Sequence, residues 1–312
     1  MAKMRADSLI KSLREKKGLT QIQLSDGICS QETLSRLENG MRLPQPWIFE
    51  SLLKRLGEEP EYYPYAFITK KDKKIADLKF ELKSLLRNKD EESMIQAEKL
   101  IAELEKDKTF NEKAYEKLNS SFLHRAKATV AFKKKKYDDL YEHALNAVRV
   151  TIPHFDLNDI DAIDTYSLTF DEIWAINQIG ASFLQRGELN ISTNIFLKLI
   201  QSVNKHSYYE DEEGRRYIAI LYNLITSLGR SRRYLETLKY CEQGLELCHR
   251  HQHSYYYPLI LFNKACSLLY LSRKEETLEL LQKVFTLFKA YDRIKELEQG
   301  QKWLYTEFKL TT

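Results

Sequence analysis

Residues 13–44 read LREKKGLTQIQLSDGICSQETLSRLENGMRLP, a stretch in which three glycines separate short amphipathic segments. Glycine adopts positive φ readily, so it commonly stands just past the last residue of a helix. Thr20 and Gln23 have the spacing of a capping box, in which each side chain satisfies the other's backbone N–H at a helix start. We therefore predict one helix that stops at Gly18 and a second that opens at Thr20 and ends at Gly27.

A third and a fourth short helix follow. Ser30 is a good N-cap for a helix over residues 31–38, which Gly40 terminates. Proline suits a first helical turn, so residues 46–56 predict the fourth helix, with Gly57 just past its end. Two short helices joined around a glycine are the helix-turn-helix layout, whose second helix lies in the major groove of DNA.

Residues 8–57 resemble the lambda-repressor-like family of helix-turn-helix proteins, and the quoted stretch carries the resemblance. The resemblance makes residues 31–38 the recognition helix, the one that enters the major groove. It implies an internal ion pair between Arg14 and Glu38, which fixes the first helix against the recognition helix. It also implies that Gln21 hydrogen-bonds a phosphate at the N-terminus of the second helix. The residues that it places at the DNA are Gln21, Ser30, Gln31, Glu32, Arg36, Asn39 and Arg42.

The side chains expected on the exposed face of the recognition helix suit base recognition. Gln pairs with adenine, Arg with guanine, and Glu accepts a hydrogen bond from cytosine. For any one of them the alternative is a contact to phosphate or sugar, and Glu32 also suits the helix dipole as an N-terminal acid. Glu32 stands where many relatives carry a neutral polar residue, which leaves the base preference open. Residues 1–66 hold 10 Lys and Arg against 9 Asp and Glu, so docking depends on the placement of charge and on dimerisation.

The composition of the whole chain predicts an all-α protein. Only 10 glycines and 6 prolines occur in 312 residues, and residues 59–179 contain no glycine. β-Hairpins and glycine-rich phosphate loops both need glycine, for positive φ or for close approach of the backbone. Its absence from this stretch therefore argues against a Rossmann or P-loop enzyme. The net charge of +4 is too mild to indicate nucleic-acid binding by itself.

Four helical hairpins recur after the first 66 residues. In each hairpin a small or apolar residue is followed three positions later by an apolar residue. A polar turn and a second amphipathic helix come next, and this order resembles that of tetratricopeptide repeats. The aligned positions are Ala128, Gly180, Ile225 and Ala265. Their spacings exceed the roughly 34 residues of a standard repeat, which indicates longer helices and insertions. A weaker pair is expected over residues 74–87 and 91–106, and a capping helix over 290–308.

Together the two parts resemble the peptide-sensing regulators of Gram-positive bacteria: Rgg, NprR, PlcR and PrgX, grouped with the Rap phosphatases. The resemblance implies a helix-turn-helix domain over residues 1–66 and a right-handed superhelix of tetratricopeptide-like hairpins over 67–312. It implies a cytoplasmic homodimer that binds a pseudo-palindromic operator in double-stranded DNA. In that family the concave face of the repeats binds a short linear signalling peptide, which changes the DNA-binding state in quorum sensing.

The hairpin register nominates residues for a peptide groove. Asparagine amides give and accept one hydrogen bond each with an extended peptide backbone, arginine takes a carboxylate, and aromatic rings supply side-chain pockets. The nominated residues are Arg125, Asn177, Gln178, Tyr222, Asn223, Phe262 and Asn263. The alternative is that these are ordinary polar positions on a solvated helix face.

Other signals point to no chemistry. Cys248, His249, His251 and His253 do not match the usual spacing of structural zinc ligands, and no local motif indicates catalytic residues, so we expect neither a metal, a cofactor nor an enzyme. The four cysteines form no CxxC, and no apolar run reaches the length of a membrane span, which favours a cytoplasmic protein. Two rival functions stay open: a Rap-type repeat protein that inhibits a signalling partner, and a dimeric repressor without a ligand.

Overall fold

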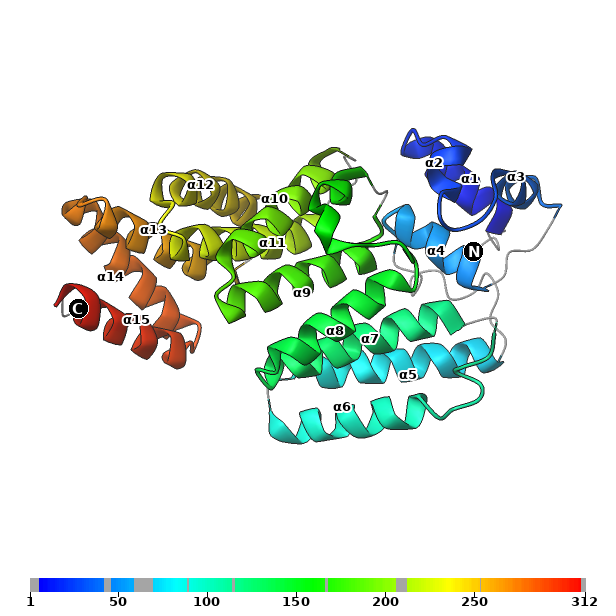
Figure 1. The fold of residues 1–312 in the computed structure, drawn as a ribbon, viewed down its shortest axis with the longest axis horizontal. Helices are drawn as coiled ribbons and strands as arrows, with labels where there is room; N and C mark the ends of the chain where they lie inside the picture. The colour runs from blue at the N-terminus through cyan, green and yellow to red at the C-terminus, as the bar shows by residue number, and fades with distance from the viewer. Residues whose placement is uncertain are drawn as a thin grey trace. The chain divides into compact units, whose positions relative to one another are not determined.

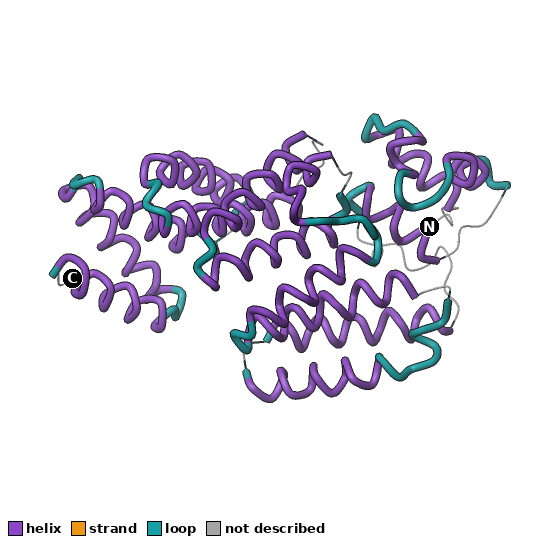
Figure 2. The backbone as a smooth tube through the Cα atoms, viewed as in Figure 1, coloured by secondary structure: helices purple, strands orange, loops and turns teal. Residues whose placement is uncertain are grey.

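The computed structural model describes residues 6–41, 46–58, 70–88, 90–113, 116–165, 168–205, 212–252 and 254–309. These residues form helices joined by turns and loops, with no strand among them (Figure 2). The predicted all-α class is confirmed. The chain divides into two compact units, Met1–Glu188 with Gln201–Tyr208, and Leu189–Ile200 with Tyr209–Thr312. The predicted domain boundary at residue 66 lies outside the described residues.

The first unit begins with four short helices around one apolar core (Figure 1). They are α1 (Ala6–Lys16), α2 (Gln21–Ser25), α3 (Gln31–Glu38) and α4 (Pro46–Arg55). Ile10, Leu24, Leu34 and Leu52, one from each helix, are fully buried in this core. The glycines that follow the four helices have φ between 65° and 73°, the left-handed region in which an added side chain is strained. They are Gly18, Gly27, Gly40 and Gly57.

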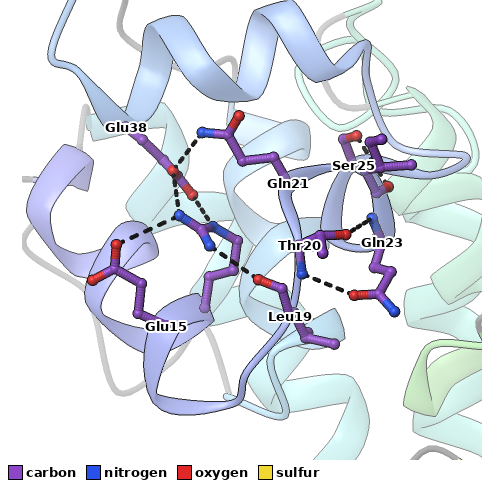
Figure 3. Close-up of polar contacts among 9 residues, drawn as sticks. Glu15, Leu19, Thr20, Gln21, Gln23, Ser25 and Glu38 are labelled. Atoms are coloured by element: carbon purple, nitrogen blue, oxygen red, sulfur yellow. Dashed lines mark hydrogen bonds and ion pairs between the residues drawn. The ribbon is translucent and has the colours of Figure 1, made fainter.

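The predicted caps hold the starts of α2 and α3. The Thr20 hydroxyl accepts a hydrogen bond from the Gln23 backbone N–H at 3.2 Å, and the Gln23 side-chain oxygen accepts one from the Thr20 N–H at 2.8 Å (Figure 3). The Ser30 hydroxyl accepts a hydrogen bond from the Thr33 N–H at 3.1 Å. Each cap satisfies backbone donors that a short helix leaves unpaired, and so fixes where the helix begins.

The rest of the first unit consists of longer helices and one 3₁₀ segment. They are α5 (Lys70–Arg87), α6 (Glu91–Leu104), α7 (Glu116–Lys133), α8 (Tyr137–Arg149), η2 (Leu157–Thr165) and α9 (Phe170–Arg186). The weak pair predicted before the four repeats is present as α5 and α6, which lie side by side (Figure 1). Ala128 and Gly180, the aligned small residues of α7 and α9, are buried, as close packing of helices requires.

The second unit contains α11 (Glu212–Arg230), α12 (Tyr234–Arg250), α13 (Tyr257–Tyr270), α14 (Lys274–Ala290) and α15 (Ile294–Phe308), with most of α10 (Leu189–Lys205). Ile225 and Ala265, the aligned positions of α11 and α13, are fully buried. The predicted capping helix over 290–308 begins four residues late. Ala290 ends α14 instead, because Asp292 turns the chain in the left-handed region with φ of 52°.

The hairpin turns share one backbone solution. A residue with positive φ stands in each of five fully described turns, α7–α8, α9–α10, α11–α12, α13–α14 and α14–α15, and among these the turn between α9 and α10 uses a glycine, Gly187. The other four are Lys135, Arg232, Ser272 and Asp292. In the last three turns an arginine follows directly and pairs with a glutamate three residues on, at 2.6–2.7 Å: Arg233–Glu236, Arg273–Glu276 and Arg293–Glu296. Every described helix is too short or too polar to cross a membrane.

Candidate nucleic-acid interface

A buried carboxylate ties the first three helices together. Glu38, at the end of α3, accepts hydrogen bonds from Arg14 Nε at 2.6 Å and Nη2 at 2.8 Å, and from Gln21 Nε2 at 2.8 Å (Figure 3). Arg14 Nη1 also donates to the Leu19 carbonyl at 2.9 Å. The Glu38 side chain is only 2% exposed. The implied ion pair is confirmed, and it sets the angle of the recognition helix against α1 and α2.

The charge on Glu38 is stabilised by its partners. Burial by itself raises the pKa of a carboxyl group, because it disfavours the ionised form. At Glu38 the hydrogen bonds from Arg14 and Gln21, with the Arg14 charge, outweigh burial and hold the pKa below the usual 4.5. Glu38 is therefore ionised in the folded domain at neutral pH, and its two partners are positioned by a full negative charge.

Gln21 has a use that the sequence did not reveal. One N–H of its side-chain amide is committed to Glu38. An amide nitrogen carries two N–H groups, so one donor remains for a phosphate oxygen. The phosphate contact stays a prediction, and the hydrogen bond to Glu38 fixes the orientation of the Gln21 side chain.

The recognition helix presents a polar face to solvent. Gln31, Glu32, Arg36 and Asn39 are exposed, whereas Leu34 and Leu37 on the opposite face are buried in the core. Arg36 Nη2 lies 2.6 Å from Glu32 Oε1, and the two side chains remain 57% and 72% exposed. Exposed pairs of this kind contribute little stability, so both groups stay available to DNA. Ser30 is exposed too, but its hydroxyl caps α3. Arg42 lies outside the described residues.

The predicted peptide residues of the first unit are largely buried. Asn177 and Gln178 on α9 are both buried, which is not the setting of ordinary polar residues on a solvated helix face. Gln178 Nε2 donates to the Thr129 hydroxyl on α7 at 3.4 Å, while its side-chain oxygen meets no donor among the described residues. Arg125 on α7 pairs with Asp171 on α9 at 2.6 Å. The structure thus brings these three residues onto two packed helices.

The predicted peptide residues of the second unit are half-buried. The Tyr222 ring lies 5.2 Å from that of Tyr256, and Phe262 packs against the aromatic rings of α14 and α15. Asn263 donates its amide N–H to the Leu259 carbonyl of its own helix at 2.9 Å. Asn223 is half-buried as well. A role for these four in peptide binding stays a prediction.

An alternating row of charges links α4 to the repeat helices. Lys79 lies 3.7 Å from Glu50, Glu50 2.9 Å from Lys54, Lys54 2.7 Å from Asp171, and Asp171 2.6 Å from Arg125. We call these five residues the charge row. Four of them, all but Arg125, have no signal in the sequence, because they come from α4, α5 and α9 and only tertiary packing brings them together.

The partners of each group decide its pKa. Burial raises the pKa of Glu50, but Lys54 and Lys79 more than reverse this and leave it at about 2. Burial lowers the pKa of Lys54, yet Asp171 and Glu50 raise it above the usual lysine value. At Lys79 burial prevails over the attraction of Glu50, so its pKa is lowered. Lys79 is thus less well compensated than Lys54.

The comparisons with known proteins agree with this geometry. Residues 10–63 match the model of a helix-turn-helix family. This part of the chain is a helix-turn-helix domain. No curated protein is similar enough in sequence to match it.

Solved structures share the fold of this chain over nearly its whole length. One is Bacillus thuringiensis PlcR in complex with the peptide PapR7 and DNA, with 19% identity, a TM-score of 0.59, and coverage of 95% of this chain and 98% of PlcR. Another is apo ComR from Streptococcus vestibularis, with 16% identity, a TM-score of 0.52, and coverage of 97% and 98%. A third is ComR from Streptococcus vestibularis in complex with its cognate signalling peptide XIP, with 17% identity, a TM-score of 0.51, and coverage of 96% of this chain and 97% of ComR. The chain therefore has the fold of PlcR and ComR.

Proposed function

We propose that this protein is a homodimeric transcription regulator that reads a two-part DNA operator and is controlled by a short linear peptide bound to its repeats. The observation that carries the proposal is the recognition helix, which exposes Gln31, Glu32 and Arg36 on a frame fixed by Glu38. Two such helices in one dimer would enter successive major grooves roughly 34 Å apart.

The peptide part of the proposal has separate support. PlcR and ComR, which share the fold, are solved with the peptides PapR7 and XIP. Asn177 and Gln178 are buried amides, and Gln178 keeps an acceptor with no partner among the described residues. Amides of this kind match the alternating donors and acceptors of an extended peptide backbone.

DNA reading is tested with Arg36→Ala. The full chain selects its operator from random duplexes, and the affinity for this site and for single-base variants is measured by fluorescence anisotropy. A base contact by Arg36 predicts a loss of about tenfold or more at one position and relaxed preference there. A variant with unchanged affinity and unchanged preference would show that the recognition surface is misplaced.

Arg250→Ala is the matched control. Arg250 pairs with Glu246 across one helical turn at 2.6 Å on α12, with exposure similar to that of Arg36 and Glu32. Its removal deletes an equivalent charge and an equivalent surface ion pair outside the helix-turn-helix domain. We expect it to leave the base preference unchanged.

Peptide control is tested by adding a library of short linear peptides to the chain bound to its operator. A regulator of the proposed kind captures a subset of the peptides and changes its DNA affinity. DNA binding without any captured peptide would instead indicate a ligand-independent repressor. Failure to select any DNA would favour a repeat protein that acts on a protein partner.

A further inference from the structure

The charge row ends in a cation on both sides. Lys79 and Arg125 are its end members, and each has a carboxylate on one side only. Among the described residues the row therefore holds three cations and two carboxylates. The side chains of Lys79 and Arg125 are only 12% and 15% exposed. An excess positive charge with so little access to water is costly unless an anion compensates it.

Both end cations lie near one aromatic ring. Lys79 Nζ is 5.6 Å and Arg125 Cζ is 5.9 Å from the centre of the buried Phe122 ring. The ring attracts cations through its quadrupole, but this attraction is weaker than that of a full counter-charge. Burial, followed by the charges of Lys54 and then Arg125, lowers the pKa of Lys79, so the ring and Glu50 together do not fully compensate it.

Arg125 also has an unused donor. Asp171 is paired with Nη1, whereas Nε is buried and finds no acceptor among the described residues. A guanidinium presents parallel N–H groups at Nε and Nη2, and this fork matches the two oxygens of a carboxylate. A buried N–H without an acceptor costs about 1–3 kcal/mol, so ligands that supply one are favoured.

We propose that Arg125 and Lys79 form a carboxylate-binding site, in which the Nε edge of Arg125 takes the carboxylate and Lys79 supplies the second positive charge. This inference rests on the proposed function, because it names the chemistry by which one part of a controlling peptide is held. The carboxylate comes from the peptide C-terminus or from an Asp or Glu side chain.

The site has a direct connection to the DNA-binding helices. Asp171 shares its carboxylate between Arg125 and Lys54, and Lys54 belongs to α4. A second carboxylate at Arg125 weakens the ion pair between Arg125 and Asp171, and so strengthens the ion pair between Asp171 and Lys54. Occupancy of the site therefore alters the ion pair that joins α4 to α9.

The test uses the full chain and a library of short linear peptides in four versions: free or amidated C-termini, each with or without Asp and Glu. Peptides captured by the wild type are identified by mass spectrometry. We expect the amidated peptides without acidic residues to be captured at least about tenfold less well than those that carry a carboxylate. The version that is retained tells whether the C-terminus or a side chain supplies the group.

Two variants test the residues. Arg125→Gln and Lys79→Gln are each expected to remove the preference for carboxylate. Arg125→Lys keeps the charge but loses the fork, so it should retain part of the preference. Arg186→Gln is the matched control, because Arg186 also pairs with an acid and lies over an aromatic ring, Phe183, outside the row. Circular dichroism verifies that each variant is folded.

The outcomes separate the two proposals. Capture of neutral and acidic peptides alike, unchanged in the variants, would overturn the carboxylate site and leave peptide control standing. Capture of no peptide at all overturns both. In a further arm, thermal stabilisation by inorganic phosphate in the wild type and not in Arg125→Gln, together with equal capture of acidic and neutral peptides, would identify a site for free anions, which overturns the peptide as its source.

Discussion

At the residue scale, two carboxylates organise the first unit. Glu38 accepts hydrogen bonds from two helices and Asp171 pairs with cations from two others. Each lies where several elements meet, and each is matched by more than one donor. Ionised groups in such places set geometry, since removing one partner leaves a buried charge without compensation.

Replacement of Arg14 by Met is expected to destabilise the helix-turn-helix domain by about 3 kcal/mol, because it leaves the buried Glu38 charge with Gln21 as its remaining partner. Urea denaturation, followed by the NMR signals of α1–α3, measures the loss. Lys16→Met, an exposed change on the same helix, is the control. A loss of less than about 0.5 kcal/mol for Arg14→Met would mean that the pair is not important for stability.

Acid is expected to weaken the same domain. The pKa of Glu38 is lower in the folded chain than its usual 4.5, so the carboxylate contributes stability above 4.5 that is lost as the pH falls through the folded value. Urea midpoints of the α1–α3 signals should therefore fall as the pH is taken from 5 down towards 3. In Glu38→Gln this part of the pH dependence should be absent, and an identical acid limb in the variant would contradict the assignment.

At the element scale, the short turns between the repeat helices contain strained backbone. Four of the five left-handed turn residues carry a side chain, although the left-handed region costs such residues roughly 1 kcal/mol. The arginine after the left-handed residue then pairs with a glutamate in the first turn of the next helix in α12, α14 and α15. The repeated ion pair marks the helix start where no side chain caps the backbone.

Ser272→Gly is expected to raise the stability of the second unit by about 0.5–1 kcal/mol, because glycine adopts φ of 64° without strain. Ser272 is exposed, so little packing is lost. Differential scanning calorimetry should show a higher melting temperature. Gly187→Ala, in the first unit, makes the reverse change at φ of 84°, and should lower the melting temperature of that unit. Equal effects of the two substitutions would refute the strain argument.

At the scale of the whole molecule, the charge row joins the DNA-binding helices to the repeats. Lys54 of α4 and Asp171 of α9 lie 117 positions apart and meet at 2.7 Å. Buried ion pairs seldom add much net stability against apolar replacements, but they specify one arrangement of the elements that carry them. We infer that the row fixes how α4 packs on the repeats of the same unit.

A double-mutant cycle of Lys54→Met and Asp171→Asn is expected to show a coupling energy of about 1–3 kcal/mol in urea denaturation, because the two charges compensate each other in a largely buried place, with side chains 17% and 24% exposed. The control cycle is Arg186→Met with Asp138→Asn. That pair has a similar distance of 2.9 Å, but Asp138 is exposed, so a coupling below about 0.5 kcal/mol is expected. Equal couplings in the two cycles would show that burial adds nothing.

The local rules of the chain predicted most of the fold. The capping residues, the glycine stops and the period of apolar residues are properties of neighbouring positions, and they gave α1–α4 and the hairpins of both units. The start of α15 was wrong by four residues, since Asp292 adopts a left-handed turn that the sequence signals of glycine or asparagine do not announce.

By itself the sequence determined the all-α class, the helix-turn-helix domain and the candidate base-reading face, because each depends on residues within a few turns of one another. Tertiary structure alone decided the second role of Gln21, the burial of Asn177 and Gln178, and the charge row. A carboxylate and its cation more than a hundred positions apart have no local signature. Only the packing of α4, α5, α7 and α9 brings these charges within a few ångströms and removes the water that would otherwise screen them.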